Sequence, residues 1–329
     1  MYQERLQLRR DVFNLILLLV FSALAALVPW PEIFRSINGY PMVDREVYTE
    51  YFLYGKNVLE YKEFAGFLSY YTNEFLWHFG VISLLALGVD LSDIFLAISF
   101  FLYFSFGFLV LRERSPWVLL LVINPLVVDF AFSQLRLALA VSLLVWSYLS
   151  LTKYRLLSLA LLVASLFIHS ATAIFIAIYF VVRLLDWASG RLELKLSAEF
   201  AVLCFTGALI SIAIGPMREV ILSAIGDRRV DYPDMASSVQ YSLFWVGLLG
   251  MSFVFAKNVL QSEANRYAIV IISIVAVNVL HGGYSTRFLA AAFPFLLNLV
   301  LSFGGAAKFV PWIFVLYAGL QWFYWLRFI

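Results

Sequence analysis

The sequence predicts an all-α, polytopic integral membrane protein, and three observations lead to this fold class. Hydrophobic residues make up 63% of the 329 residues and charged residues 13%, whereas soluble domains are about 45–50% apolar and about 25% charged. The mean hydropathy is +0.90. Apolar runs recur along the whole chain, and one span needs roughly 20 mostly apolar residues. We therefore expect one transmembrane domain, residues 1–329, with about 10–12 spans.

The apolar runs define the expected helices. They lie at about 11–29, 92–111, 116–131, 134–151, 156–168, 171–187, 198–214, 240–256, 267–281, 286–303 and 310–326. A further apolar run, 75–89, is short for a span, and a re-entrant or interfacial helix suits it better than a full crossing. A full crossing there would invert the sidedness of every later loop. The alternative is a different boundary among the early helices, which would also keep the later basic loops on the cytoplasmic side.

Lysine and arginine positions set the expected orientation. Arg5, Arg9 and Arg10 precede the first run, and the positive-inside rule places them in the cytoplasm. We interpret this run as an uncleaved span, although a cleaved signal peptide has a similar pattern. The later basic residues then fall on the cytoplasmic side: Arg112, Arg114, Lys153, Arg155, Arg191, Lys195, Lys257 and Lys308.

Two polar segments, 31–74 and 215–238, do not suit lipid and are expected as extracytoplasmic loops, the first directly after the first span. The first interleaves acidic residues and tyrosines: Asp44, Glu46, Glu50, Glu60, Glu63 and Glu74 with Tyr48, Tyr51, Tyr54, Tyr61, Tyr70 and Tyr71. Amphipathic helices on the membrane surface explain this pattern, and so does a carbohydrate site. The second segment mixes Arg228 and Arg229 with aspartates. It is either a solvated loop or a source of phosphate contacts.

Cations stand at three helix starts on the expected outer side. Gln134 and Arg136 open one helix, His169 precedes another, and His281 and Arg287 flank "GGYST". Helix N-termini favour anions such as phosphate, and the arginine fork matches phosphate oxygens. Alone, Arg136 is equally an interfacial anchor and His169 a structural histidine. Beside carboxylates that can remove a proton from a hydroxyl, the set favours an anionic, lipid-linked sugar substrate.

Other kinds of site lack a sequence signal. The three histidines are far apart along the chain and Cys204 is the single cysteine, so neither a metal site nor a disulfide is predicted. No glycine-rich phosphate loop and no soluble domain are evident. We expect no cofactor and no nucleic-acid partner.

Several of these stretches resemble the EpsG/Wzy-type polysaccharide polymerases. The matching stretches are "DREVY" with Asp44, Glu74 ahead of an apolar helix, "SQLRLALAVSLLVWSYL" with Arg136, "ASLFIHSATAIF" with His169, and "TRF" with Arg287. The resemblance is firmest over about 120–180 and looser over 40–90. Gln134 precedes the arginine, whereas the family commonly has a glutamine after it, where Leu137 stands here.

The resemblance implies a GT-C-like glycosyltransferase of the bacterial cytoplasmic (inner) membrane. Such an enzyme joins oligosaccharide repeat units carried on undecaprenyl diphosphate at the outer face and releases undecaprenyl diphosphate. Arg136, Arg287, Gln134, His281, Arg228 and Arg229 are the expected diphosphate ligands. Arg136 and His169 are also expected to be catalytic, with Asp44 or Glu74 as the base.

The expected partners are the lipid-linked oligosaccharide, the bilayer and a chain-length regulator protein. Two alternatives stay open. One is another outer-face transferase, such as an O-antigen ligase or an acyltransferase, although three isolated histidines offer an acyltransferase little support. The other is a flippase of lipid-linked sugars, which should carry charges along a path within its spans.

Overall fold

The computed structural model describes residues 2–54, 74–224, 239–283 and 285–327. It is 85% helix, without a strand in these ranges. The all-α fold and the membrane-spanning character are therefore confirmed. Six helices in the described ranges are long and apolar enough to cross a membrane, or eight if each of two bent helix pairs forms one span. Three further apolar helices in these ranges have only 10–17 residues, and the expected number of 10–12 spans stays a prediction.

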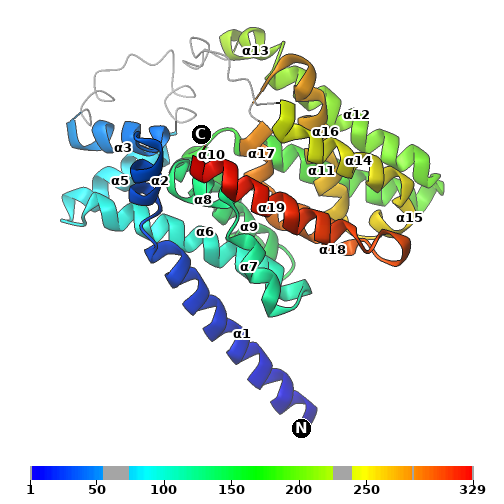
Figure 1. Ribbon diagram of the computed structural model, residues 1–329, viewed down its shortest axis with the longest axis horizontal. Coiled ribbons are helices and arrows are strands. Elements are labelled where there is room, and N and C mark those ends of the chain that lie inside the picture. Colours follow the sequence, from blue (N-terminus) through cyan, green and yellow to red (C-terminus); the bar gives the residue numbers. More distant parts are fainter. Residues whose placement is uncertain (1, 55–73, 225–238, 284, 328–329) are drawn as a thin grey trace. The chain divides into compact units, whose positions relative to one another are not determined.

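The described chain divides into two compact units, which are treated separately here. The first unit runs to Ser170 and also includes the end of α19 from Gln321. The second runs from Ala171 to Leu320. The α-helices of the first unit are labelled in Figure 1: α1 (Tyr2–Leu27), α2 (Trp30–Asn38), α3 (Val43–Tyr54), α5 (Phe75–Ala86), α6 (Leu91–Glu113), α7 (Leu119–Val122), α8 (Pro125–Phe132), α9 (Leu135–Ser150) and α10 (Arg155–Ile168). A short 3-10 helix, η2 (Pro116–Val118), precedes α7.

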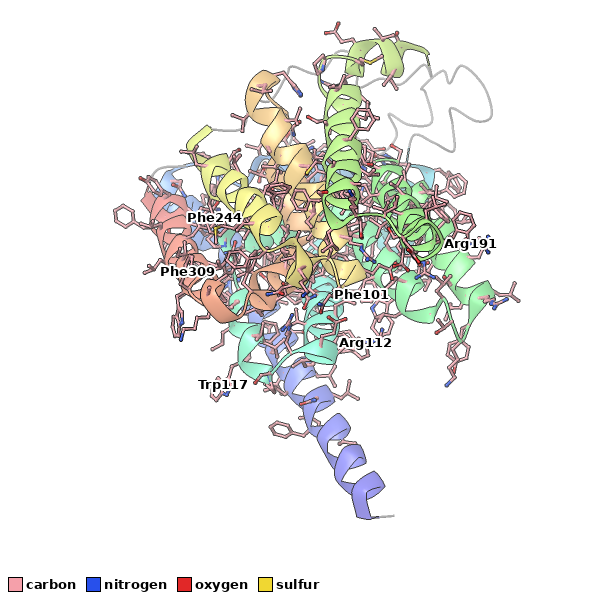
Figure 2. The ribbon with its side chains drawn as sticks, turned by 90° about the vertical axis from the view of Figure 1, so that its right-hand side faces the viewer. Phe101, Arg112, Trp117, Arg191, Phe244 and Phe309 are labelled. Carbon is pink, nitrogen blue, oxygen red and sulfur yellow. The ribbon has the colours of Figure 1, made fainter. Side chains whose placement is uncertain are left out.

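Helix α6 is the centre of the first unit. It is antiparallel to α1, since Phe21 packs on Tyr103, with ring centres 6.3 Å apart, and Leu18 lies against Gly107. It runs in the same general direction as α9, since Trp146 near the end of α9 donates to Ser105 at 3.0 Å. Arg112 therefore lies at the end of the unit opposite the start of α9. Figure 2 labels Arg112 together with Trp117, where α6 gives way to η2.

The expected single helix 116–131 is wrong, because the structure breaks it into η2, α7 and α8. Ile123 and Asn124 leave the helical conformation before Pro125. Proline has no N–H and disfavours helical backbone in the residue before it, so it begins a helix more readily than it continues one. Asn124 caps the new helix through its side chain, which accepts from Leu126 N at 3.0 Å.

Helix α5 is compatible with the re-entrant interpretation of 75–89. Its 12 residues span about 18 Å at the usual rise, less than the roughly 30 Å of a bilayer core. The chain then enters α6, where the Arg45 guanidinium lies 4.9 Å from the ring centre of Phe95. Ser99 on α6 bonds to the carbonyl of Ala131 near the end of α8. Thus α5 and α6 both begin near α3 and the end of α8, as expected for a segment that does not cross.

The second unit is built around α16 and has its own bent helix pair. Its helices are α11 (Thr172–Leu192), α12 (Leu196–Ile214), α13 (Arg218–Ala224), α14 (Val239–Val254), α15 (Ala256–Val259), α16 (Glu263–His281), α17 (Ser285–Ala291), α18 (Phe293–Ser302), η4 (Gly305–Ala307) and α19 (Val310–Arg327). The expected single helix 286–303 is wrong: α17 and α18 meet at 75°, just before Pro294. Gly207 lets α12 approach α16 closely, because a Cβ there would lie 2.7 Å from the carbonyl oxygen of Val270.

Candidate functional site

The site begins at a sharp bend in the first unit, which we call the elbow: Ser133 and Gln134, between α8 and α9. The two helices meet at 106°. The last helical bond of α8 runs from Ser133 N to Asp129 O, and the first of α9 from Ala138 N to Gln134 O. Arg136 is thereby placed on the first turn of a new helix, not in the middle of a continuous span.

Arg136 is held by two partners from distant parts of the sequence. Its Nη1 donates to Oε2 of Glu74 in an ion pair, and its Nε donates to the hydroxyl oxygen of Tyr48 at 3.0 Å. The guanidinium carbon also lies 5.0 Å from the ring centre of Tyr48. The side chain of Arg136 is 20% exposed and that of Glu74 5%. Arg136 is thus a partly buried, paired cation and not a side chain extended to headgroups.

His169 completes the cluster through the same carboxylate. It ends α10, with extended backbone, and its Nδ1 bonds to Oε1 of Glu74. Helices α9 and α10 are antiparallel neighbours, joined at their other ends by reciprocal bonds between Ser147 and Ser158 at 2.8 Å. The end of α10 therefore lies beside the start of α9.

The protonation pattern of the Glu74–His169 pair follows from the bonding. A carboxylate beside an arginine is stabilised as an anion and can only accept hydrogen bonds. Nδ1 of His169 must therefore carry the hydrogen. In the neutral ring, Nε2 then holds the lone pair.

Glu74 has an unusual backbone. Its φ of 67° and ψ of 35° are left-handed, and it stands directly before α5. Residues other than glycine adopt this region at a cost of order 1–3 kcal/mol, and such strain persists where the surroundings enforce it. The side chain of this residue is bonded to both Arg136 and His169.

Aromatic side chains form one wall of the cluster. Tyr48 packs edge-on against Trp77, with ring centres 5.6 Å apart, and Trp77 is 1% exposed. Burial raises the pKa of Tyr48, and this effect outweighs the nearby positive charge of Arg136, which lowers it. The hydroxyl therefore stays protonated at neutral pH and can accept from Arg136 while keeping its own proton for donation.

Three of the predicted site residues are brought together: Arg136, His169 and Glu74. Asp44 lies one turn before Tyr48 on α3 and acts on it electrostatically. Gln134 is buried at the elbow, and its carboxamide oxygen has no hydrogen-bond partner within the described ranges. The involvement of Asp44 and Gln134 in the reaction stays a prediction.

The other predicted ligands lie in the second unit or outside the described residues. His281 and Arg287 belong to the second unit. There the Oγ of Ser211 lies 3.1 Å from Nε2 of His281 and 2.5 Å from Oδ1 of Asn278. His281 thus takes part in a network between α12 and α16. Arg228 and Arg229 lie outside the described residues.

Sequence reasoning did not foresee what Tyr48, Trp77 and Arg45 do. Tyr48 was noted in "DREVY" without a role, yet it bonds Arg136 directly. Asp44 and Arg45 stand four and three residues before Tyr48, and residues at this spacing share one face of a helix. This spacing was the available signal. Trp77 gave no signal, since a buried aromatic in an apolar run is ordinary core.

Comparisons with protein-family models, with curated proteins and with solved structures found no match to this chain. The fold and the cluster define its class: an all-helical, membrane-spanning protein with a partly buried arginine–glutamate–histidine cluster at the ends of three helices of one unit.

Proposed function

We propose that the protein is a polysaccharide polymerase that joins undecaprenyl-diphosphate-linked oligosaccharide repeat units and releases undecaprenyl diphosphate. The observation that carries this proposal is the convergence of Arg136 and His169 on Glu74. It combines a group suited to a diphosphate with a histidine oriented by a carboxylate. These are the two demands of a glycosyl transfer from a lipid diphosphate to a hydroxyl.

The chemistry assigns one task to each group. The sugar hydroxyl of one lipid-linked unit attacks the anomeric carbon of the growing chain, and the bond from that carbon to the diphosphate oxygen breaks. The hydroxyl proton passes to Nε2 of His169, while Glu74 holds Nδ1 and stabilises the imidazolium, as the carboxylate does in hydrolase triads. Arg136 neutralises the charge that develops on the leaving diphosphate.

This refines the expected role of Glu74. A carboxylate that already accepts bonds from a guanidinium and an imidazole is better suited to orient His169 than to take the substrate proton itself. Asp44 remains the second predicted base, with its position one turn before Tyr48 in its favour.

The positions of basic residues support an outer-face reaction. Arg112 lies in the last turn of α6, Arg114 directly follows that helix, and Lys153 follows the end of α9. The cluster, in contrast, includes Arg136 at the start of α9. Basic residues favour the cytoplasmic side, so the opposite end, with the cluster, is expected to face outward.

Reconstitution with a defined lipid-linked repeat unit tests the proposal. Wild-type protein should produce a ladder of products on a gel. Arg136→Ala should leave single units and no ladder. Arg155→Ala is the matched control, because Arg155 is exposed at the start of α10, and it should polymerise normally. Normal chain lengths in Arg136→Ala would remove Arg136 from the mechanism.

A second candidate function is another outer-face transferase, a ligase or an acyltransferase. The pair of Glu74 and His169 favours it specifically, since it supplies the acid beside a histidine that the sequence did not reveal. Transfer of a completed chain to a different acceptor, without ladder formation, would favour the ligase, and acyl transfer to a sugar hydroxyl would favour the acyltransferase. Movement of units across vesicle membranes without any product would indicate a flippase.

A further inference from the structure

Helix α3 contacts the elbow on both sides of the bend. Before the bend, Nη1 of Arg45 donates to the carbonyl oxygen of Phe132, the last residue of α8, at 3.4 Å. After the bend, Tyr48 accepts from Nε of Arg136 at 3.0 Å. Arg45 and Tyr48 are three residues apart on α3, and residues at this spacing share a helix face. One face of α3 therefore bridges the elbow.

The contact before the bend satisfies a backbone carbonyl that the bend leaves without its helical partner. In a continuous helix, the carbonyl of Phe132 would accept from the N–H of residue 136. At the 106° bend this pairing is lost, and the last carbonyls of a helix need other partners. An unsatisfied carbonyl within a membrane protein costs several kcal/mol. Basic side chains commonly satisfy such carbonyls at helix C-termini, and Arg45 does so here.

Arg45 is itself held in place by a third helix. Its guanidinium carbon lies 4.9 Å from the ring centre of Phe95 on α6. Burial lowers the pKa of Arg45, while the nearby carboxylates of Glu32 and Glu46 oppose this effect. An arginine remains charged after such a shift. A cation fixed between an aromatic ring and a helix C-terminus is well suited to join α3, α6 and α8.

We propose that Arg45 is a positioning residue for Arg136. It fixes the end of α8 against α3, so that Tyr48, one turn further along α3, meets Arg136 at the start of α9. Arg136 is then held toward Glu74. The positioning is a property of the fold, and its consequence for catalysis rests on the proposed function.

A distance measurement tests the positioning without any substrate. Spin labels are attached to Val47→Cys and Tyr148→Cys in a Cys204→Ala background of the full chain in lipid nanodiscs. Val47 is 55% exposed on α3 and Tyr148 39% exposed near the end of α9. The far end of α9 moves most when the elbow angle changes, so this pair is sensitive to it.

Arg45→Gln should broaden or shift the distance distribution, because the shorter, neutral side chain loses both the carbonyl bond and the contact with Phe95. Arg45→Lys keeps a cation and one donor and should restore most of the wild-type distribution. Arg35→Met is the matched control: Arg35 is exposed on the neighbouring α2 and should leave the distribution unchanged. If Arg45→Gln does not fold, Phe95→Leu, which removes the ring beneath the same guanidinium, should give a smaller broadening.

In the polymerisation assay, Arg45→Gln should lower kcat by about 10- to 100-fold, since small misplacements of catalytic groups cost up to about 100-fold, while KM changes little. Arg45→Lys should recover most of kcat. An unchanged distance distribution in Arg45→Gln, or in Phe95→Leu if the first variant does not fold, overturns the inference whatever the activity. A broadened distribution in a protein whose wild type makes no polymer leaves the inference standing and removes the proposed function.

Discussion

Replacing Glu74 with glutamine removes a negative charge that both Arg136 and His169 contact. The amide has nearly the same size, but it is neutral and its NH2 group would face a donor. Removing one partner of a buried ion pair costs about 3–5 kcal/mol, because the other charge stays buried and unpaired. Since the Arg136 side chain is 20% exposed, water screens part of the loss, and we expect a value near the lower limit, about 3 kcal/mol.

The assay is a double-mutant cycle on the free energy of unfolding, measured by reversible unfolding in mixed micelles with increasing SDS. It compares Glu74→Gln, Arg136→Gln and the double variant with the wild type. Groups in direct contact typically couple by about 0.5–3 kcal/mol, and the double variant should therefore lose less than the sum of the singles. Glu50→Gln is the control, since Glu50 is exposed on α3 and should change stability by less than about 0.5 kcal/mol.

The left-handed backbone of Glu74 provides a second arm of the same experiment. Glu74→Ala and Glu74→Gly both lose the carboxylate, but only glycine adopts a φ of 67° without strain. Glu74→Gly should therefore be more stable than Glu74→Ala by about 1 kcal/mol. A Glu74→Gln variant as stable as Glu50→Gln, with no coupling to Arg136, would refute the view that Glu74 and Arg136 form a buried, mutually dependent charge pair.

Two further predictions concern Tyr48 and Gly207. Tyr48→Phe keeps the ring beneath Arg136 but loses the hydroxyl, which should lower the free energy of unfolding by about 1.5 kcal/mol. Burial raises the pKa of Tyr48 above its ordinary value of 10.0, so the unfolded chain loses this proton at a lower pH than the folded protein does. The wild type should therefore lose stability as the pH rises above 10, and the variant should lose less. Gly207→Ala should destabilise by about 1–3 kcal/mol, since its Cβ would lie 2.5 Å from that of Ser273. Gly247→Ala is the control: its Cβ would meet nothing within 4 Å, and the change should be neutral or stabilising. Unfolding in SDS measures the stability of all three variants.

Much of the fold was predictable from periodicity and hydropathy. The runs 92–111 and 198–214 correspond closely to α6 (Leu91–Glu113) and α12 (Leu196–Ile214). Hydropathy failed where a run contained a break. Asn124–Pro125 and Pro294 carried a recognisable signal for helix starts, but hydropathy treats proline and asparagine only as a small decrease within an apolar run.

The candidate site was predictable in its residue types but not in its pairing. Arg136 and His169 stood out because a charged or titratable group beside an apolar helix requires a reason. Their common partner did not stand out, because Glu74 was one of seven acidic residues in the polar segment 31–74. Nothing in the spacing of 62 residues to Arg136 or 95 residues to His169 selects it from the others.

The sequence by itself determined that this chain is helical and membrane-spanning, and which few polar residues require explanation, because hydrophobicity and charge are properties of each residue and its near neighbours. The tertiary structure decided which of those residues meet. Antiparallel packing of α9 and α10 brings Arg136 beside His169, and a left-handed residue before α5 turns Glu74 between them. Contacts between residues so distant in sequence arise from the packing of whole helices, which no local pattern encodes.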